Sequence, residues 1–212
     1  MPRPKQADPL ARRQILAAAL DVFSRQGYAG ATLDDITVAA NLSKGAIYWY
    51  FDSKADLFAE LLGERASLFS ELLEDAARSG ATPLGGLRAM WIRWMEALES
   101  DRGYQAYVRL SHLRVEVADE PREGMDARRA EERRTQAFVT ERLLAAVAAR
   151  ELPATADVEA DALTFVGAGN GIVRAWLLVP ETFSPRKMAP RIWDLLLAGW
   201  RGADGADGTR PV

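Results

Sequence analysis

The stretch from Thr32 to Leu62, TLDDITVAANLSKGAIYWYFDSKADLFAELL, decides the fold of this chain. At two places in it a hydroxyl residue is followed three positions later by an acidic residue, Thr32 by Asp35 and Ser53 by Asp56. Such a pair satisfies the free amide groups at the start of a helix. The stretch therefore predicts helices that begin at these two points.

The segment between these two caps predicts a helix, a turn and a second short helix. The first helix, residues 33–40, has apolar side chains at the spacing of one helical face, and Asn41 tolerates the left-handed conformation that ends a helix. Ser43 caps the second helix, residues 44–50, which exposes small, basic and aromatic side chains. This pattern is typical of a helix-turn-helix, whose second helix enters the major groove of DNA.

The same residues resemble the DNA-binding domain of the TetR family of bacterial repressors. The resemblance covers residues 12–62 without a gap, and the segments 32–36, 43–51 and 53–58 carry it. It implies that the DNA contacts come from Thr32, Ser43, Lys44, Gly45, Ala46, Tyr48, Trp49, Tyr50 and Lys54, with packing as an alternative role for Trp49. Lysines offer cations to phosphates, tyrosines offer hydroxyls to phosphates and rings to thymine methyl groups, and the small residues allow a close approach.

The composition favours an all-α fold and excludes several classes of protein. Of the 212 residues 49% are apolar, and no alternating β-branched run stands out. There is one histidine and no cysteine, which excludes disulfides, zinc fingers and thiolate nucleophiles, and we find no catalytic constellation, metal site or cofactor motif. No apolar run reaches the roughly 18 residues of a membrane span. We therefore expect a cytoplasmic protein that is not an enzyme and has no membrane contact.

Charge is distributed unevenly along the chain. The formal net charge is −3, but residues 1–55 hold seven basic and five acidic residues, a balance of +2 that leaves −5 for the remainder. Residues 1–55, the head, are weakly basic, and the remainder, the body, is acidic. This distribution suits a protein that contacts phosphates with one end only.

The sequence predicts four regions. A flexible arm, residues 1–9, precedes a helix-turn-helix domain, residues 10–52, whose first helix (10–26) stops at Gly27 and packs on Ile36, Ile47 and Phe51. A ligand-binding and dimerisation domain, residues 53–201, has helices at about 53–78, 83–99, 103–118, 121–150, 157–178 and 185–200, and a disordered tail follows at 202–212. The helix from Ser53 belongs to both halves, so coupling between them is expected to pass along it.

The last two predicted helices carry more apolar residues than packing on a single core requires. A homodimer formed through both helices explains this excess, and two copies would read the paired half-sites of a palindromic operator. The predicted interface residues are Ile172, Val173, Trp176, Ile192, Trp193, Leu196 and Trp200.

The body also resembles the ligand-binding half of AcrR-type repressors of multidrug efflux pumps. The segments 112–116, 125–134, 151–154 and 171–183 carry this second resemblance, which places His112 and Asn170 in a ligand cavity. The other candidates for its lining are Trp91, Trp94, Met95, Val108, Phe138 and Phe165, for all of which a plain core role is the alternative. A core role is equally open for His112.

Two further segments have competing interpretations. The run GAGNG at 167–171 is similar to a nucleotide-binding glycine loop, but without a preceding strand it favours close helix packing. The arginine-rich residues 122–134 favour a solvated helix face with ion pairs one turn apart, not a second nucleic-acid site.

Together these observations predict a homodimeric TetR-like repressor of a multidrug efflux operon. It binds double-stranded operator DNA and leaves when a small amphipathic or aromatic effector enters the body. A TetR-type sensor of a metabolite or lipid is the alternative within the class. Outside the class, a helical ligand-binding protein or an enzyme would show no salt-dependent binding to duplex DNA.

Overall fold

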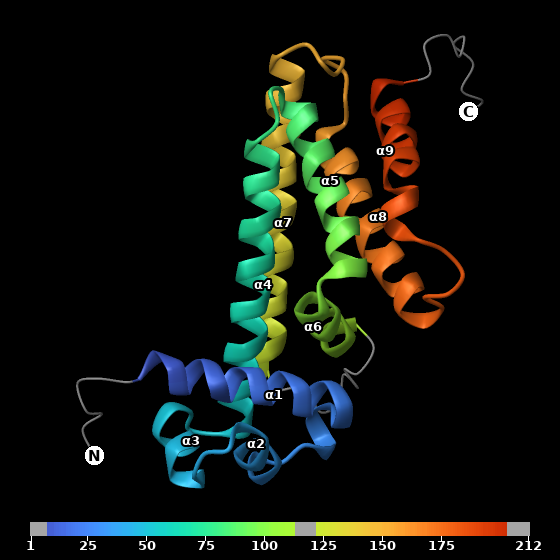
Figure 1. The fold of residues 1–212 in the computed structure, drawn as a ribbon. Helices are drawn as coiled ribbons and strands as arrows, with labels where there is room; N and C mark the ends of the chain where they lie inside the picture. Colours follow the sequence, from blue (N-terminus) through green and yellow to red (C-terminus); the bar gives the residue numbers. More distant parts are fainter. Residues whose placement is uncertain (1–7, 113–121, 203–212) are drawn as a thin grey trace. The chain divides into compact units, whose positions relative to one another are not determined.

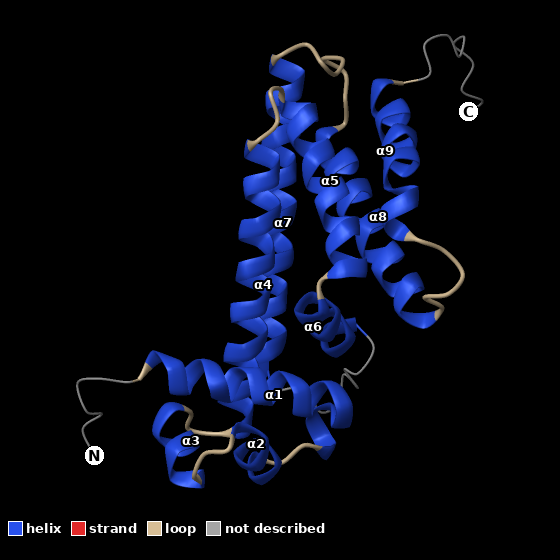
Figure 2. Cartoon of the chain, viewed as in Figure 1, coloured by secondary structure: helices blue, strands red, loops and turns tan. Residues whose placement is uncertain are grey.

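In a computed structural model of the chain, residues 8–112 and 122–202 are described, and within these ranges the chain forms nine helices and no strand (Figures 1 and 2). The helices are α1 Pro9–Gly30, α2 Leu33–Ala40, α3 Lys44–Tyr50, α4 Lys54–Arg78, α5 Pro83–Ser100, α6 Arg102–His112, α7 Arg122–Ala148, α8 Val158–Leu178 and α9 Pro185–Arg201. The predicted all-α class is confirmed. The predicted arm and tail lie outside the described residues except for 8, 9 and 202, as does the part of the predicted helix 103–118 beyond His112.

The start of α2 has the predicted cap. The Asp35 amide donates to the Thr32 hydroxyl oxygen (3.1 Å), and the Asp35 carboxylate accepts from the Thr32 amide (3.0 Å). Asn41 adopts the left-handed conformation at the end of α2, and the Ser43 hydroxyl then accepts from the Ala46 amide (3.2 Å). Because these contacts join residues close in sequence, the boundaries of both helices follow from the sequence.

The end of α1 is interrupted at Gly27, where the sequence predicted a stop. Gly27 has φ of +74°, a conformation that glycine adopts without steric cost, and one further turn carries the chain to Gly30.

The helices α1 to α3 surround a core that includes parts of α4 and α6. The fully buried apolar residues include the predicted Ile36, Ile47 and Phe51. They also include Ile15, Leu16, Ala19 and Phe23 of α1 and Leu57, Phe58, Leu61 and Leu62 of α4. Leu110 of α6 is buried in the same cluster. The predicted packing of α1 on Ile36, Ile47 and Phe51 is confirmed, but the core is larger than the three helices expected from the sequence.

The chain divides into two compact units, each described by itself. Unit 1 contains residues 1–70 and 101–132, and unit 2 contains residues 71–100 and 133–212. The helices α4 and α7 each contribute to both units. This division does not follow the boundary at residue 52 expected from the sequence, which stays a prediction.

In unit 2, α5 packs on α8 and α9. The Trp91 ring nitrogen of α5 donates to the Ala189 carbonyl of α9 (3.0 Å), and Trp91 has no exposed surface. At the start of α9, the Glu99 carboxylate accepts from the Ser184 hydroxyl (2.6 Å) and the Arg186 amide (3.0 Å). These contacts fix α9 along α5.

The glycine run lies inside α8. A Cβ atom at Gly169 would come within 2.2 Å of the Trp94 ring, so α5 and α8 approach closely only because this position has no side chain. The interpretation of the run as a packing feature is therefore confirmed at Gly169.

Candidate nucleic-acid interface

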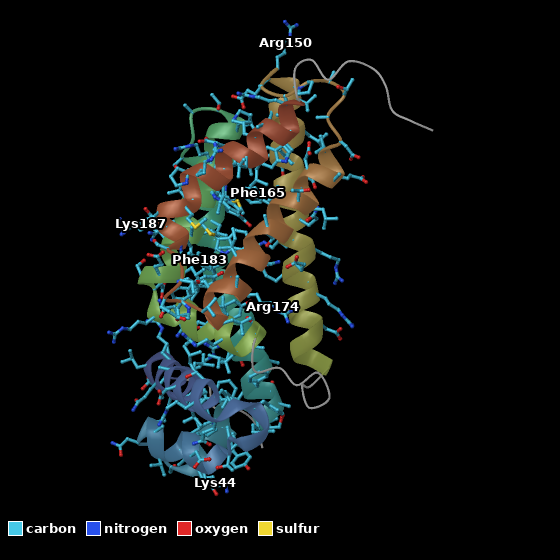
Figure 3. The ribbon with its side chains drawn as sticks, turned by 90° about the vertical axis from the view of Figure 1, so that its right-hand side faces the viewer. Lys44, Arg150, Phe165, Arg174, Phe183 and Lys187 are labelled. Carbon is cyan, nitrogen blue, oxygen red and sulfur yellow. The ribbon has the colours of Figure 1, made fainter. Side chains whose placement is uncertain are left out.

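The outward side of α3 carries exposed polar and aromatic side chains. Lys44, Gly45 and Tyr48 are exposed, whereas Ile47 is buried in the core of unit 1. Figure 3 shows Lys44 at the outer edge of the pair formed by α2 and α3. The N-terminal half of α3 is thus free to approach a surface, which is what a recognition helix requires.

Lys44 is joined to α2 by an ion pair. Its ammonium nitrogen lies 2.6 Å from a carboxylate oxygen of Asp34, and both side chains are exposed, by 54% and 67%. The hydrogen bond to Asp34 raises the pKa of Lys44 above its ordinary value. Lys44 therefore carries a positive charge at the surface of α3, with a carboxylate held beside it.

Tyr50 does not face outward as predicted. Its ring is half-buried against the core of unit 1, and its hydroxyl donates to the Asp8 carbonyl (3.1 Å). The reason is the helical period, because Tyr50 follows the buried Ile47 by three residues and so shares its face. Trp49 is also half-buried, with its ring 4.6 Å from that of Tyr50, which agrees with the packing role considered for it.

Lys54 has internal partners that the sequence did not indicate. Its ammonium donates to the carbonyls of Tyr28 (2.8 Å) and Ala31 (2.9 Å) and lies 4.4 Å from the centre of the Tyr28 ring. Lys54 therefore joins the start of α4 to the end of α1. The Lys54 ammonium has three N–H donors, and two of them bind these carbonyls. Only the third N–H can therefore donate to a phosphate.

Of the remaining predicted contacts, Thr32 and Ser43 sit at the N-caps of α2 and α3, where their hydroxyls bind backbone amides. Ala46 is partly exposed on α3. The structure thus brings Thr32, Ser43, Lys44, Gly45, Ala46 and Tyr48 onto the helix-turn-helix pair.

Two residues that join α1 to other helices of unit 1 were missed. The Gln14 side chain of α1 donates to the Ala40 carbonyl at the end of α2 (2.6 Å). Arg12 donates to Glu60 and to Glu64 (3.1 Å) on α4, and the hydrogen bond to Glu60 raises its pKa. These partners lie 26 to 52 residues apart in sequence, so no local pattern predicts them.

The residues expected to line a ligand cavity are divided between the two units. Trp91, Trp94, Met95 and Phe165 are buried in unit 2, and the Trp91 ring centre lies 5.2 Å from Phe165 and 6.1 Å from Trp94. Figure 3 shows Phe165 among the helices of this unit. Phe138 and Asn170 are half-buried, Val108 is a buried residue of unit 1, and the side chain of His112 is outside those described.

Part of the predicted dimer interface is the core of a single chain. Val173 has no exposed surface, and Trp193 and Trp200 are only 2% and 4% exposed, with their rings 5.5 Å apart. The apolar face of α9 packs on its own chain, which its sequence period alone does not reveal. Ile172, Trp176, Ile192 and Leu196 are half-buried.

The described residues contain no group of three or more histidine or acidic side chains placed to hold a metal ion. None of the helices within residues 8–112 and 122–202 combines the length and apolar character needed to span a membrane.

Comparison with known proteins covers both halves of the chain. Residues 15–61 match the family described as bacterial regulatory proteins, tetR family, and residues 82–201 match the C-terminal region of MAATS-type transcriptional repressors. The chain is 30% identical over 186 residues to the HTH-type transcriptional regulator AcrR of Shigella flexneri, covering 87% of this chain and 86% of that protein.

Solved structures share the fold. A SmeT–triclosan complex, SmeT being the repressor of the Stenotrophomonas maltophilia multidrug efflux pump SmeDEF, superposes with a TM-score of 0.80 at 25% identity and covers 90% of this chain and 91% of that one. The fatty acid degradation regulator FadR of Bacillus halodurans has a TM-score of 0.80 at 20% identity, covering 94% and 100%.

Both matched families are families of transcriptional regulators, and AcrR is a transcriptional regulator as well. The chain is therefore a regulator and not an enzyme. The first family match falls on the helices of the helix-turn-helix, and the second falls on the helical remainder of the chain. The chain belongs to the TetR family of bacterial transcriptional regulators.

Proposed function

We propose that this protein is a homodimeric repressor that binds a palindromic operator through α3 and is released by a small amphipathic or aromatic molecule. The observation that carries the proposal is the exposed N-terminal half of α3, whose opposite face is fixed in a buried core. Its target is a multidrug efflux operon, a proposal supported by the similarity to AcrR over most of both chains and by the role of SmeT. Such a protein acts in the cytoplasm, where the DNA is.

DNA binding rests on a few placed groups. Tyr48 offers an exposed hydroxyl and ring, Lys44 offers a cation, and Gly45 allows the helix to approach the bases closely. Because the net charge is −3, the body does not add a general attraction to phosphate. Affinity therefore depends on a few of the seven basic residues within residues 1–55, and it falls as the salt concentration rises.

Release requires that the effector bind better to a state in which the two recognition helices no longer match the operator. We infer that α4 transmits this change, since it contributes residues to both units. Leu110 of α6 is buried in the core of unit 1, so a movement of α6 would also reach the helix-turn-helix. A sensor of a metabolite or lipid is the alternative within the family. Acyl compounds are therefore tested as effectors together with amphipathic and aromatic ones.

A Tyr48→Ala variant is expected to bind the operator about 1–3 kcal/mol more weakly, because it loses a contact made by the exposed part of α3. Lys44→Ala is expected to bind more weakly as well, with a salt dependence reduced by about one ion. Fluorescence anisotropy with labelled operator measures both. Arg93→Ala, which removes an ion-paired cation from α5, is the matched control and is expected to bind normally. Normal binding by both α3 variants would show that another surface reads the DNA.

The dimer interface is proposed to use the side chains of α8 and α9 that the chain itself leaves uncovered. Leu163 and Leu178 of α8 and Met188 and Leu195 of α9 are exposed, with Leu163 at 66% and Leu195 at 57%. Gly167 and Gly171 of α8 border open space, so a second backbone can approach closely there. These residues extend the half-buried Ile172, Trp176, Ile192 and Leu196 of the sequence-based prediction.

The double variant Leu163→Glu, Leu195→Glu is expected to be a monomer, because two carboxylates would be buried against apolar surface. Sedimentation velocity at several protein concentrations measures the oligomeric state. Leu144→Glu changes a leucine of α7 that is 56% exposed and is expected to leave the dimer unchanged. A double variant that still sediments as the wild-type dimer would exclude this interface.

A further inference from the structure

One acidic side chain lies next to the proposed recognition surface without a role in the helix cap. Asp35 makes both contacts of the capping box at the start of α2. Asp34 precedes it and instead points its carboxylate to Lys44 of α3, at 2.6 Å. The side chain of Asp34 is 67% exposed, so burial does not explain its position.

An exposed carboxylate at this place opposes binding to DNA in general. It lies beside the exposed residues of α3, where phosphates of any duplex would approach, and like charges repel. The neighbouring Lys44 is the only cation of α3, and its ion pair with Asp34 reduces its attraction for phosphate. Asp34 therefore lowers the affinity for DNA of any sequence. A gain in selectivity among DNA sequences would offset that loss.

The pair of side chains has the hydrogen-bonding groups that match one kind of base pair. Lysine has three N–H donors, so Lys44 can keep its bond to Asp34 and still donate to O6 or N7 of guanine. A carboxylate has several acceptor positions, so Asp34 can also accept from the N4 amino group of cytosine. A thymine O4 facing the carboxylate would instead bring two acceptors together.

We propose that Asp34 is a specificity-determining residue that, together with Lys44, selects a G·C base pair in each operator half-site and disfavours other sequences. The pair sits at the first turns of α2 and α3, and the N-terminal residues of a recognition helix are those that reach base edges. This inference rests on the proposed function, because it requires α3 to enter the major groove.

The test compares wild type with Asp34→Asn on three sets of duplexes: the operator, its single base-pair variants, and an unrelated duplex of equal length. Each is measured by fluorescence anisotropy across salt concentrations. Asp34→Asn is expected to bind the unrelated duplex severalfold more tightly and to lose about tenfold of the preference for one G·C pair in each half-site. Preferences at other positions are expected to stay within twofold, and Lys44→Ala is expected to lose preference at the same base pair.

Two further variants separate this role from a structural one. Asp34→Glu keeps the carboxylate and is expected to restore part of the base preference. Asp21→Asn removes the same charge from an ion pair on α1 and is expected to change neither base preference nor binding to the unrelated duplex. A structural role alone would weaken binding to all sequences alike.

The inference is overturned if Asp34→Asn keeps every base preference, or if it weakens binding evenly on all duplexes. Wild type that fails to distinguish operator from unrelated DNA would remove the proposed function itself. Wild type that does distinguish them, beside an unchanged Asp34→Asn variant, would remove only the role of Asp34.

Discussion

Replacement of Trp91 by alanine is expected to lower the free energy of unfolding by about 3–5 kcal/mol. Trp91 has no exposed surface, its ring contacts those of Phe165 and Trp94, and its N–H donates to the Ala189 carbonyl. Alanine would leave a cavity between α5, α8 and α9 and would remove that hydrogen bond. Urea unfolding followed by circular dichroism, at a fixed protomer concentration because dimers gain stability with concentration, measures the loss.

Trp91→Phe is the matched control, because it keeps an aromatic ring and removes the N–H donor. Its expected loss is smaller, about 1–3 kcal/mol, which is the range for a buried group left without its partner. The two variants also separate the two roles considered for Trp91. A Trp91→Ala variant as stable as wild type would contradict the packed-core role and favour a ring that lines an open ligand cavity.

Replacement of Phe23 by alanine is expected to cost about 3–5 kcal/mol as well, but in unit 1. The Phe23 ring is fully buried, at 5.0 Å from Phe58 of α4 and 6.0 Å from Tyr28 at the end of α1. Its loss would loosen the core on which α3 rests. Weaker operator binding is therefore expected together with the lower stability.

Phe23→Leu retains much of the apolar volume and is expected to give smaller losses of both stability and binding. Urea unfolding and operator anisotropy on the same preparations measure the two effects. Sedimentation is expected to show an unchanged oligomeric state, since the proposed interface lies on α8 and α9. Full operator affinity in a destabilised Phe23→Ala variant would contradict the dependence of α3 on this core.

The parts of the structure that the sequence predicted correctly depend on neighbours in the chain. The box formed by Thr32 and Asp35 and the left-handed Asn41 involve residues at most a few positions apart, so their chemistry can be recognised without knowing the fold. The exposure of Lys44 and Tyr48 follows from the helical period once Ile47 is placed inward. The same period, applied to Tyr50, would have placed it on the buried face.

The parts that were missed depend on residues far apart in the chain. Lys54 binds carbonyls more than twenty positions away, and any exposed lysine at a helix start would look the same in sequence. In α9 the apolar residues serve two surfaces, the core of the chain at Trp193 and Trp200 and an exposed face at Leu195. Periodicity shows that a face is apolar but not which molecule covers it.

Binding of the purified protein to the DNA upstream of its own and neighbouring genes tests the proposed function most directly. Binding is measured across salt concentrations, with and without a panel of amphipathic, aromatic and acyl compounds. We expect tight binding to one of these duplexes that weakens steeply with salt and is released by at least one compound. Equal affinity for these duplexes and for an unrelated one would contradict it.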